Sequence, residues 1–147
     1  KVQQKTKPKV SFYDSTMYEI TEENIKQIVK SKQADIYDER EELIDATIVV
    51  KSDDSSYNND IASSNSMIKK GDKVFLRDNV NLQLADGTNI KTEQLDYNVN
   101  TKIASNNVPF TAIRDNDTFK GDTLFFDGVS DHIEVNKVKF RMKVENQ

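Results

Sequence analysis

Apolar and polar residues alternate with a period of two along much of the chain. In residues 80–85 every second residue is large and apolar, Asp86-Gly87 follows, and residues 90–97 return to an interrupted apolar alternation. A period of two is typical of a β-strand with one buried face, and Asp-Gly is a strong signal for a tight hairpin turn. This stretch therefore predicts a β-hairpin.

The same outline recurs about every 30 residues, which is the signature of a repeat architecture. The four segments that share it are 28–50, 60–82, 89–110 and 118–140. Their equivalent apolar anchors are Val29, Ile61, Ile90 and Phe119. The small residues two positions after these anchors are Ser31, Ser63, Thr92 and Gly121. A polar turn and a closing apolar pair complete each unit.

Each unit reads as two or three short strands that cannot bury an apolar face alone, so neighbouring units must stack. Residues 10–20 form an extra leading strand, and 22–28 is either a short helix or the partner strand of a hairpin. The polar stretch 51–60 is the longest loop candidate. One-sided burial over many strands predicts an all-β fold, an open or partly closed sandwich of stacked antiparallel strands.

Strand parity predicts which residues form the inner face. They are Tyr18, Ile20, Ala34, Ile36, Ile48, Val50, Ile61, Val80, Leu82, Leu84, Ile90, Leu95, Tyr97, Ile103, Val108, Phe110, Phe119, Leu124, Phe126, Val138, Phe140, Met142 and Val144.

Composition narrows the function classes. The chain has 147 residues, 35% of them hydrophobic and 31% charged, with a net charge of −4, so it carries no electrostatic footprint for nucleic acid. It has no cysteine, which excludes disulfides and thiolate metal sites. No apolar run approaches the roughly 20 residues that span a bilayer. Because the chain begins at Lys1 without Met, we expect it to be a processed or excised piece, with any membrane segment upstream of it.

Signals for catalysis are weak, and the sequence predicts no enzyme activity, no cofactor and no metal site. The single histidine, His132, lies near a turn without an evident partner. The acidic stretch 37–45 could supply paired carboxylates for glycoside hydrolysis, but a solvated bend is the favoured interpretation. Residues 53–60 resemble a calcium loop in composition, yet lack its glycine and its final glutamate.

The last predicted strand, 136–144, alternates apolar residues with Lys and Arg, and nothing long enough to pair with it follows. An edge strand of this kind offers unpaired backbone groups to an incoming strand. The alternative is that its lysines keep the edge unpaired. Both interpretations stay open.

The run 73–110, continued by 118–126, resembles the repeat of the periplasmic lipopolysaccharide-transport proteins (the LptA/LptC/OstA-like family). The phrase L-x-G/D-N-V appears at 76–80, I-x-T-x-x-L-x-Y at 90–97, and a closing serine–proline–phenylalanine phrase at 105–110.

The upstream part, 12–41, resembles the N-terminal half of LptC more than the bridge protein LptA, so the resemblance covers nearly the whole chain. Asp78 stands where the family usually has glycine, which could change that turn but not the architecture.

The resemblance implies a β-jellyroll that is open at both ends. It divides the chain into a flexible juxtamembrane segment at 1–9 and a periplasmic lipid-carrier domain at 10–147. The domain would be tethered to the inner membrane by an N-terminal helix upstream of Lys1. It would bind lipopolysaccharide acyl chains in its inner groove, receiving them from the inner-membrane ABC transporter and passing them to an LptA-like bridge protein.

This role requires that the apolar sides of successive strands line a shared channel wide enough for acyl chains, at about 0.8 kcal/mol for each buried methylene. The predicted groove residues are Tyr18, Ile20, Ile36, Ile48, Val50, Ile61, Val80, Leu82, Leu84, Ile90, Leu95, Tyr97, Ile103, Val108, Phe110, Phe119, Leu124, Phe126 and Phe140. The predicted partner-binding edge is Val138, Lys139, Phe140, Arg141, Met142, Lys143 and Val144. The basic residues that either meet lipid phosphates or only solvate a turn are Lys69, Lys70, Lys73 and Arg77.

Three alternatives remain beside the tethered carrier. A soluble LptA-like bridge protein would share the fold but lack the anchor. A purely structural β-repeat module would have a packed inner face and no ligand. A carbohydrate-active enzyme would need two carboxylates about 5–10 Å apart in one cleft, and is the least favoured.

Overall fold

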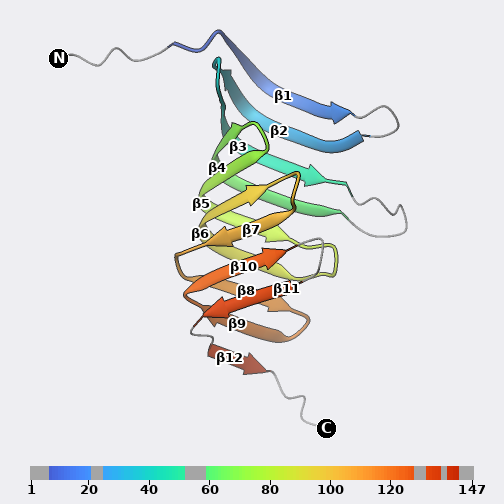
Figure 1. The fold of residues 1–147 in the computed structure, drawn as a ribbon, viewed down its shortest axis with the longest axis vertical. Helices are drawn as coiled ribbons and strands as arrows, with labels where there is room; N and C mark the ends of the chain where they lie inside the picture. The colour runs from blue at the N-terminus through green and yellow to red at the C-terminus, as the bar shows by residue number, and fades with distance from the viewer. Residues whose placement is uncertain (1–6, 21–24, 52–58, 128–131, 137–138, 143–147) are drawn as a thin grey trace, which may run out of the picture.

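The computed structural model describes residues 7–20, 25–51, 59–127, 132–136 and 139–142, and every regular element in this part is a β-strand. The strands are stacked along the long axis of the molecule, with β1 and β12 at opposite ends (Figure 1). Their bounds are β1 Val10–Ile20, β2 Ile25–Ile36, β3 Glu41–Val50, β4 Asp60–Lys70, β5 Lys73–Gln83, β6 Asn89–Asn98, β7 Ile103–Asn106, β8 Phe110–Arg114, β9 Asp117–Gly121, β10 Thr123–Asp127, β11 His132–Asn136 and β12 Lys139–Met142.

Antiparallel pairing of consecutive strands runs from β1 to β6 without a crossover. Beyond β6 the sheet divides, because the two halves of β6 pair with different short strands. The half at Asp96–Asn98 continues to β7, β10 and β11, and the half at Asn89–Thr92 continues to β8, β9 and β12. The short strands therefore group in twos, β7 with β8, β10 with β9 and β11 with β12, and each group occupies the place of one long strand that is interrupted in the middle.

The long strands β2 to β6 bend once near their middle. Inward-facing residues are two apart elsewhere in a strand but three or four apart at this point, because extra residues turn outward there. The buried residues on either side of the bend are Ser31 and Ala34, Leu43 and Ala46, Ser64 and Met67, Leu76 and Val80, and Thr92 and Leu95. Since Ser31, Ala46 and Ser64 are paired across β2, β3 and β4, the bends lie side by side on neighbouring strands.

Asp and Asn supply the backbone conformation that several bends need. Asp14, Asp45, Asp78 and Asn79 have φ values of 51°, 50°, 65° and 54°, in the left-handed region. Short polar side chains enter this region more readily than other non-glycine residues. Asp78 therefore adopts the conformation that a glycine favours, and the antiparallel pairing of β5 with β6 resumes after the bend.

The bends divide the sheet into two walls that pack against each other over one core. We call wall A the strand segments 10–13, 33–36, 41–44, 66–70, 73–77, 94–98, 103–106, 123–127 and 132–136. Wall B comprises the segments 15–20, 25–31, 46–50, 60–64, 80–83, 89–92, 110–114, 117–121 and 139–142. The largest fully buried side chains come from both walls, and they are Leu43, Met67, Val74, Leu76, Leu95, Val29, Ile48 and Val80.

Small residues occupy the inside of the bend, where the walls meet and little space is left. Ser31, Ser64, Thr92 and Gly121 are all buried at this level. The hydroxyl of Ser64 donates to the carbonyl oxygen of Ser66 across the bend at 2.7 Å, and the hydroxyls of Ser15 and Ser31 share a hydrogen bond of 2.8 Å. The small residue that recurs in the sequence thus marks the bend, although in the second segment it is Ser64 and not the predicted Ser63.

A partly buried cluster of polar groups connects the strands at the place where they are broken. Thr92 Oγ1 donates to the carbonyl oxygen of Pro109 at 2.9 Å and accepts from Asn106 Nδ2 at 3.1 Å. Asn106 Oδ1 in turn accepts the backbone N–H of Leu124 at 3.0 Å. Backbone groups freed by the breaks therefore find side-chain partners, as buried polar groups must.

The sequence correctly predicted several local elements. Asp86-Gly87 forms the turn between β5 and β6, where the N–H of Gly87 donates to the carbonyl of Leu84 at 3.0 Å and Gly87 has a φ of 93°. Residues 25–28 belong to strand β2, so the hairpin alternative is right and the helix alternative is wrong. Most of the predicted loop 51–60 lies outside the described residues.

Two predicted inner residues of β1 are exposed to solvent. Tyr18 and Ile20 are 55% and 68% exposed, whereas Met17 packs against the core. The bend at Asp14 places Met17 opposite the buried Val29, so the next residue, Tyr18, is on the other side of the strand. Ile20 follows a second irregularity, because the pairing of β1 with β2 shifts between Glu19 and Ile20.

Three further positions differ from the predicted parity. Ala62, not Ile61, is paired with the buried Ile48 and Leu82 and lies on the inner face. Ala104, not Ile103, is likewise the inward residue of β7. Val108 is half-buried in the link between β7 and β8, so it belongs to neither wall. In the first two cases a difference of one residue in register exchanges the two faces of a strand.

Candidate functional site

The inner faces of the two walls form one apolar surface along the length of the stack. Most predicted groove residues lie on it. They are Ile36, Ile48, Val50, Val80, Leu82, Leu84, Ile90, Leu95, Tyr97, Phe110, Phe119, Leu124 and Phe126. The backbone of Phe140 is paired with that of Phe119, but its side chain lies outside the described part. A contact between these residues and a lipid stays a prediction.

A small pocket lies where the two walls face each other, and we call it the cross-wall pocket. Its lining comes from both sides: Ile48, Val50, Asp60, Ala62 and Leu82 from wall B, Leu84 from the turn directly after β5, and Leu95, Tyr97, Ala104 and Phe126 from wall A. Its free volume is about 10 Å³, which is about the space of one water molecule.

At the cross-wall pocket the space between the walls is too small for an acyl chain, so the channel expected from the sequence is not open at this place. The physical reason is that two apolar walls without a ligand gain about 25 cal/mol for each Å² that they bury against each other. Binding of a long acyl chain requires the walls to move apart here.

The inner face is open at the β1 end. Val10 and Phe12 lie opposite Ile36 and the buried Ala34, yet they are 41% and 48% exposed. In the described part β1 pairs only with β2, so no further strand covers these side chains. Apolar surface of the inner face is thus accessible to a ligand from this end.

Tyr97 brings a polar group into the cross-wall pocket. Its ring packs against the core, and its hydroxyl oxygen is buried without a hydrogen-bond partner. Burial, and then the negative charge of Asp60 on wall B, raise the pKa of the Tyr97 hydroxyl. Asp60 itself accepts the backbone N–H of Ala85 at 2.8 Å. The sequence identified Tyr97 as an inward residue, but it gave no sign that the hydroxyl would be buried without a hydrogen-bond partner.

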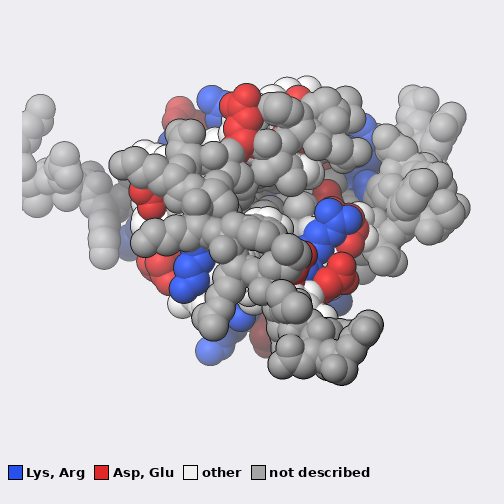
Figure 2. Space-filling model, turned by 90° about the horizontal axis from the view of Figure 1, so that it is seen from below, with Lys and Arg blue, Asp and Glu red and all other residues white. Residues whose placement is uncertain are grey.

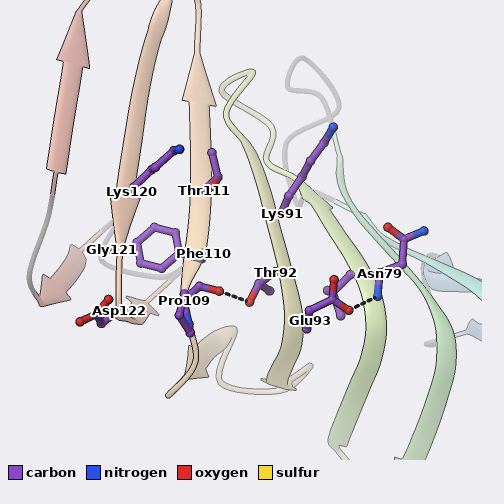
Figure 3. A pocket seen from close by; sticks show the side chains of 11 residues that line it. Asn79, Lys91, Thr92, Glu93, Pro109, Phe110, Thr111, Lys120, Gly121 and Asp122 are labelled. Carbon is purple, nitrogen blue, oxygen red and sulfur yellow. Dashed lines mark hydrogen bonds between the residues drawn. The ribbon is translucent and has the colours of Figure 1, made fainter.

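A larger and more open pocket of about 650 Å³ lies at the bends of β5 and β6, beside β8 and β9 (Figure 3). Lys91 and Lys120 contribute ammonium groups, and Glu93 accepts the backbone N–H of Asn79 at 2.9 Å. Asp122 adds a second carboxylate. Charged groups of both signs suit a hydrated ligand better than hydrocarbon, so the larger volume does not make this pocket the acyl-chain site.

The basic residues near the β4–β5 turn differ in their surroundings, because Arg77 is bonded within the sheet whereas the lysines are more exposed. Arg77 donates to Asp96 at 2.8 Å and to the carbonyl oxygen of Leu76 at 2.8 Å, so it is held by its own sheet. Lys70 and Lys73 are exposed, and Lys69 is half-exposed. Viewed from the β12 end, side chains of both charges surround the molecule (Figure 2).

Both ends of the described stack present edge strands. β1 exposes Tyr13, Tyr18 and Ile20 in addition to the inner-face residues at its start. At the other end, β12 pairs with β9, and the described part shows no second partner for it. Of the predicted partner-binding edge, Lys139, Phe140, Arg141 and Met142 form β12, whereas Val138, Lys143 and Val144 lie outside the described residues. The exposed apolar residues of β1 were missed as an edge.

Other candidate chemistry finds little support in the part of the chain that the structure describes. No group of three or more metal-ligating side chains occurs there. In the acidic stretch, Arg40 donates to Glu42 at 3.4 Å and stacks on Tyr37, with 4.1 Å between its guanidinium carbon and the ring centre. The backbone of His132 is in β11, and its side chain is outside the description. No helix among the described residues is long and apolar enough to cross a membrane.

A family model described as "Lipopolysaccharide-assembly, LptC-related" matches residues 2–141. The chain belongs to this family. LptC-related proteins are non-enzymatic, periplasmic components of lipopolysaccharide transport, so the resemblance seen in the sequence is confirmed.

Among solved structures, the chain is similar to LptH from Pseudomonas aeruginosa, described as the LptA homologous periplasmic component of the lipopolysaccharide transport device. The TM-score is 0.67 at 12% identity, and the match covers 80% of this chain and 95% of that chain. The likeness confirms the LptA-like jellyroll fold of the LptC-related chain. No curated protein sequence matches the chain significantly.

Proposed function

We propose that this chain binds the acyl chains of lipopolysaccharide between its two walls and relays the lipid from the inner-membrane ABC transporter to an LptA-like β-jellyroll protein. A general role in lipopolysaccharide transport follows from the family. The observation that carries the finer proposal is the continuous apolar inner face, which passes from the open β1 end through both walls to β9 and β10.

Transfer by a jellyroll of this kind needs moderate binding at each step. An acyl chain that replaces wall-to-wall contacts gains the burial of its methylenes but loses the contacts that the walls make with each other. The closed cross-wall pocket therefore weakens net binding, which favours release to the next protein.

Two adjacent phenylalanines provide the direct test. A photo-reactive phenylalanine analogue at Phe126, which is buried on the inner face, is expected to cross-link to lipopolysaccharide. The same analogue at Phe125, which is paired with Ser105 and faces the other side of β10, is expected to cross-link at background level. Gel mobility and detection with an antibody against lipopolysaccharide measure both. Equal labelling at the two positions would contradict binding between the walls.

Docking of partners is expected at the two ends of the stack. A negative charge in place of Met142 in β12 is expected to weaken capture of an LptA-like protein by about tenfold, because charges on an edge strand oppose strand addition. Tyr18→Glu, which places a negative charge on the opposite edge strand β1, is the control and is expected to leave capture of the LptA-like protein unchanged. Circular dichroism verifies that both variants fold. Unchanged capture by the β12 variant would assign the LptA-like partner to another surface.

The sequence upstream of Lys1 distinguishes the tethered form from the soluble bridge form. An apolar stretch of about 20 residues in the preceding reading frame supports the membrane anchor that we propose. A cleavable signal sequence there would instead support a soluble LptA-like bridge.

A further inference from the structure

The buried hydroxyl of Tyr97 has no hydrogen-bond partner in the cross-wall pocket. Leaving a polar group buried without a partner costs about 1–3 kcal/mol, and each such group in a native protein calls for an explanation. Among the described residues, the only side-chain atoms in this state are Tyr97 Oη and Gln27 Oε1. Of these two residues, only Tyr97 lines the cross-wall pocket.

We propose that the Tyr97 hydroxyl is a specificity-determining donor that hydrogen-bonds the ester or amide carbonyl at the head of a bound acyl chain. This inference rests on the proposed function, and it adds a polar requirement to a site that is otherwise apolar.

The position of Tyr97 in the wall fits a carbonyl group. Tyr97 is the second-last residue of β6, and Asp60, which faces the same pocket, is the first residue of β4. Both therefore lie near the ends of their wall segments that are farthest from the bends at Thr92 and Ser64. An acyl chain directed toward the bends would leave its carbonyl near these ends, within the region where hydrocarbon gives way to the head group.

The charge beside Tyr97 selects among possible acceptors. Asp60 is anchored by the N–H of Ala85, so its carboxylate stays near the pocket. A phosphate at the same place would be repelled by this carboxylate, whereas a neutral carbonyl would not. The Tyr97 hydroxyl is protonated over the whole physiological range even at the ordinary tyrosine pKa of about 10, and burial raises its pKa further, so the hydroxyl is able to donate.

The test compares two probes and two proteins. The probes are a diacyl glycolipid with ester-linked chains and its ether-linked analogue of the same chain length, and the variant is Tyr97→Phe. Wild type is expected to bind the ester probe about three- to tenfold more tightly than the ether probe, whereas the variant binds the two probes about equally. Isothermal titration calorimetry measures the four affinities. Tyr13→Phe, at a tyrosine that is 70% exposed, is the matched control and is expected to keep the preference of wild type.

A second measurement separates recognition from structural support. Tyr97→Phe removes a buried hydroxyl that has no partner, so it is expected to leave the free protein as stable as wild type or more stable. A lower melting temperature for the variant would show that the hydroxyl has a partner in the free protein, and would overturn the inference. An ester preference that survives Tyr97→Phe would overturn it as well. Failure of both probes to bind wild type would instead count against the proposed function itself.

Discussion

Leu43→Ala is expected to lower the free energy of unfolding by about 2–5 kcal/mol. Leu43 is 1% exposed and lies on the inner face of wall A, where it is paired with the buried Ala34 and Met67. Removing its side chain leaves a cavity in a core that both walls share. Urea denaturation followed by circular dichroism measures the change, since the described chain forms one core and should unfold as one unit.

The neighbouring residue is the control for this prediction. Ile44 follows Leu43 in β3 but is 44% exposed, because successive residues of a strand face opposite sides. Ile44→Ala is expected to cost no more than about 1 kcal/mol. Equal destabilisation by the two variants would mean that the walls do not pack against each other in solution.

Cross-linking the two walls is expected to abolish lipid binding. The chain has no cysteine, so Asp60→Cys combined with Tyr97→Cys places the only two thiols on opposite sides of the cross-wall pocket. A short thiol-specific cross-linker between them holds the walls together. Binding of a fluorescent acyl probe is expected to fall to background level after cross-linking, and mass spectrometry verifies the cross-link.

The control cross-link joins wall B to the turn that follows its own strand β5. The backbone N–H of Ala85, in this turn, donates to Asp60 at 2.8 Å, so a cross-link between Asp60→Cys and Ala85→Cys does not join wall B to wall A. We expect the cross-linked control variant to bind the probe with the same affinity as the untreated control variant. Retained binding in the wall-to-wall cross-linked protein would contradict a site that opens between the walls.

The sequence predicted the class of fold because alternation is a local property. Each half-strand has a regular period of two, and the Asp-Gly turn fixes the register of β5 with β6. The positions of Val80, Leu82 and Leu84 on the inner face follow from this pattern alone.

The errors in the predicted inner face arose where alternation is interrupted. Tyr18 follows the bend at Asp14, and Ile20 follows a further shift of pairing after Glu19, so the alternation read from the sequence no longer gives the correct face for either residue. The width between the walls was also beyond prediction from the chain alone. It depends on how the side chains of distant strands, such as Leu84 and Phe126, fit together across the pocket.

The aligned bends also have a mechanical consequence. Because they lie beside one another on successive strands, they form a single hinge line parallel to the long axis of the stack. Rotation about such a line distributes a small torsional change over many residues and leaves the ladders within each wall intact. The work of separating the walls is then mainly that of hydrating apolar surface, which carries a large heat-capacity change. The affinity for a lipid should accordingly vary with temperature along a curve rather than a straight line.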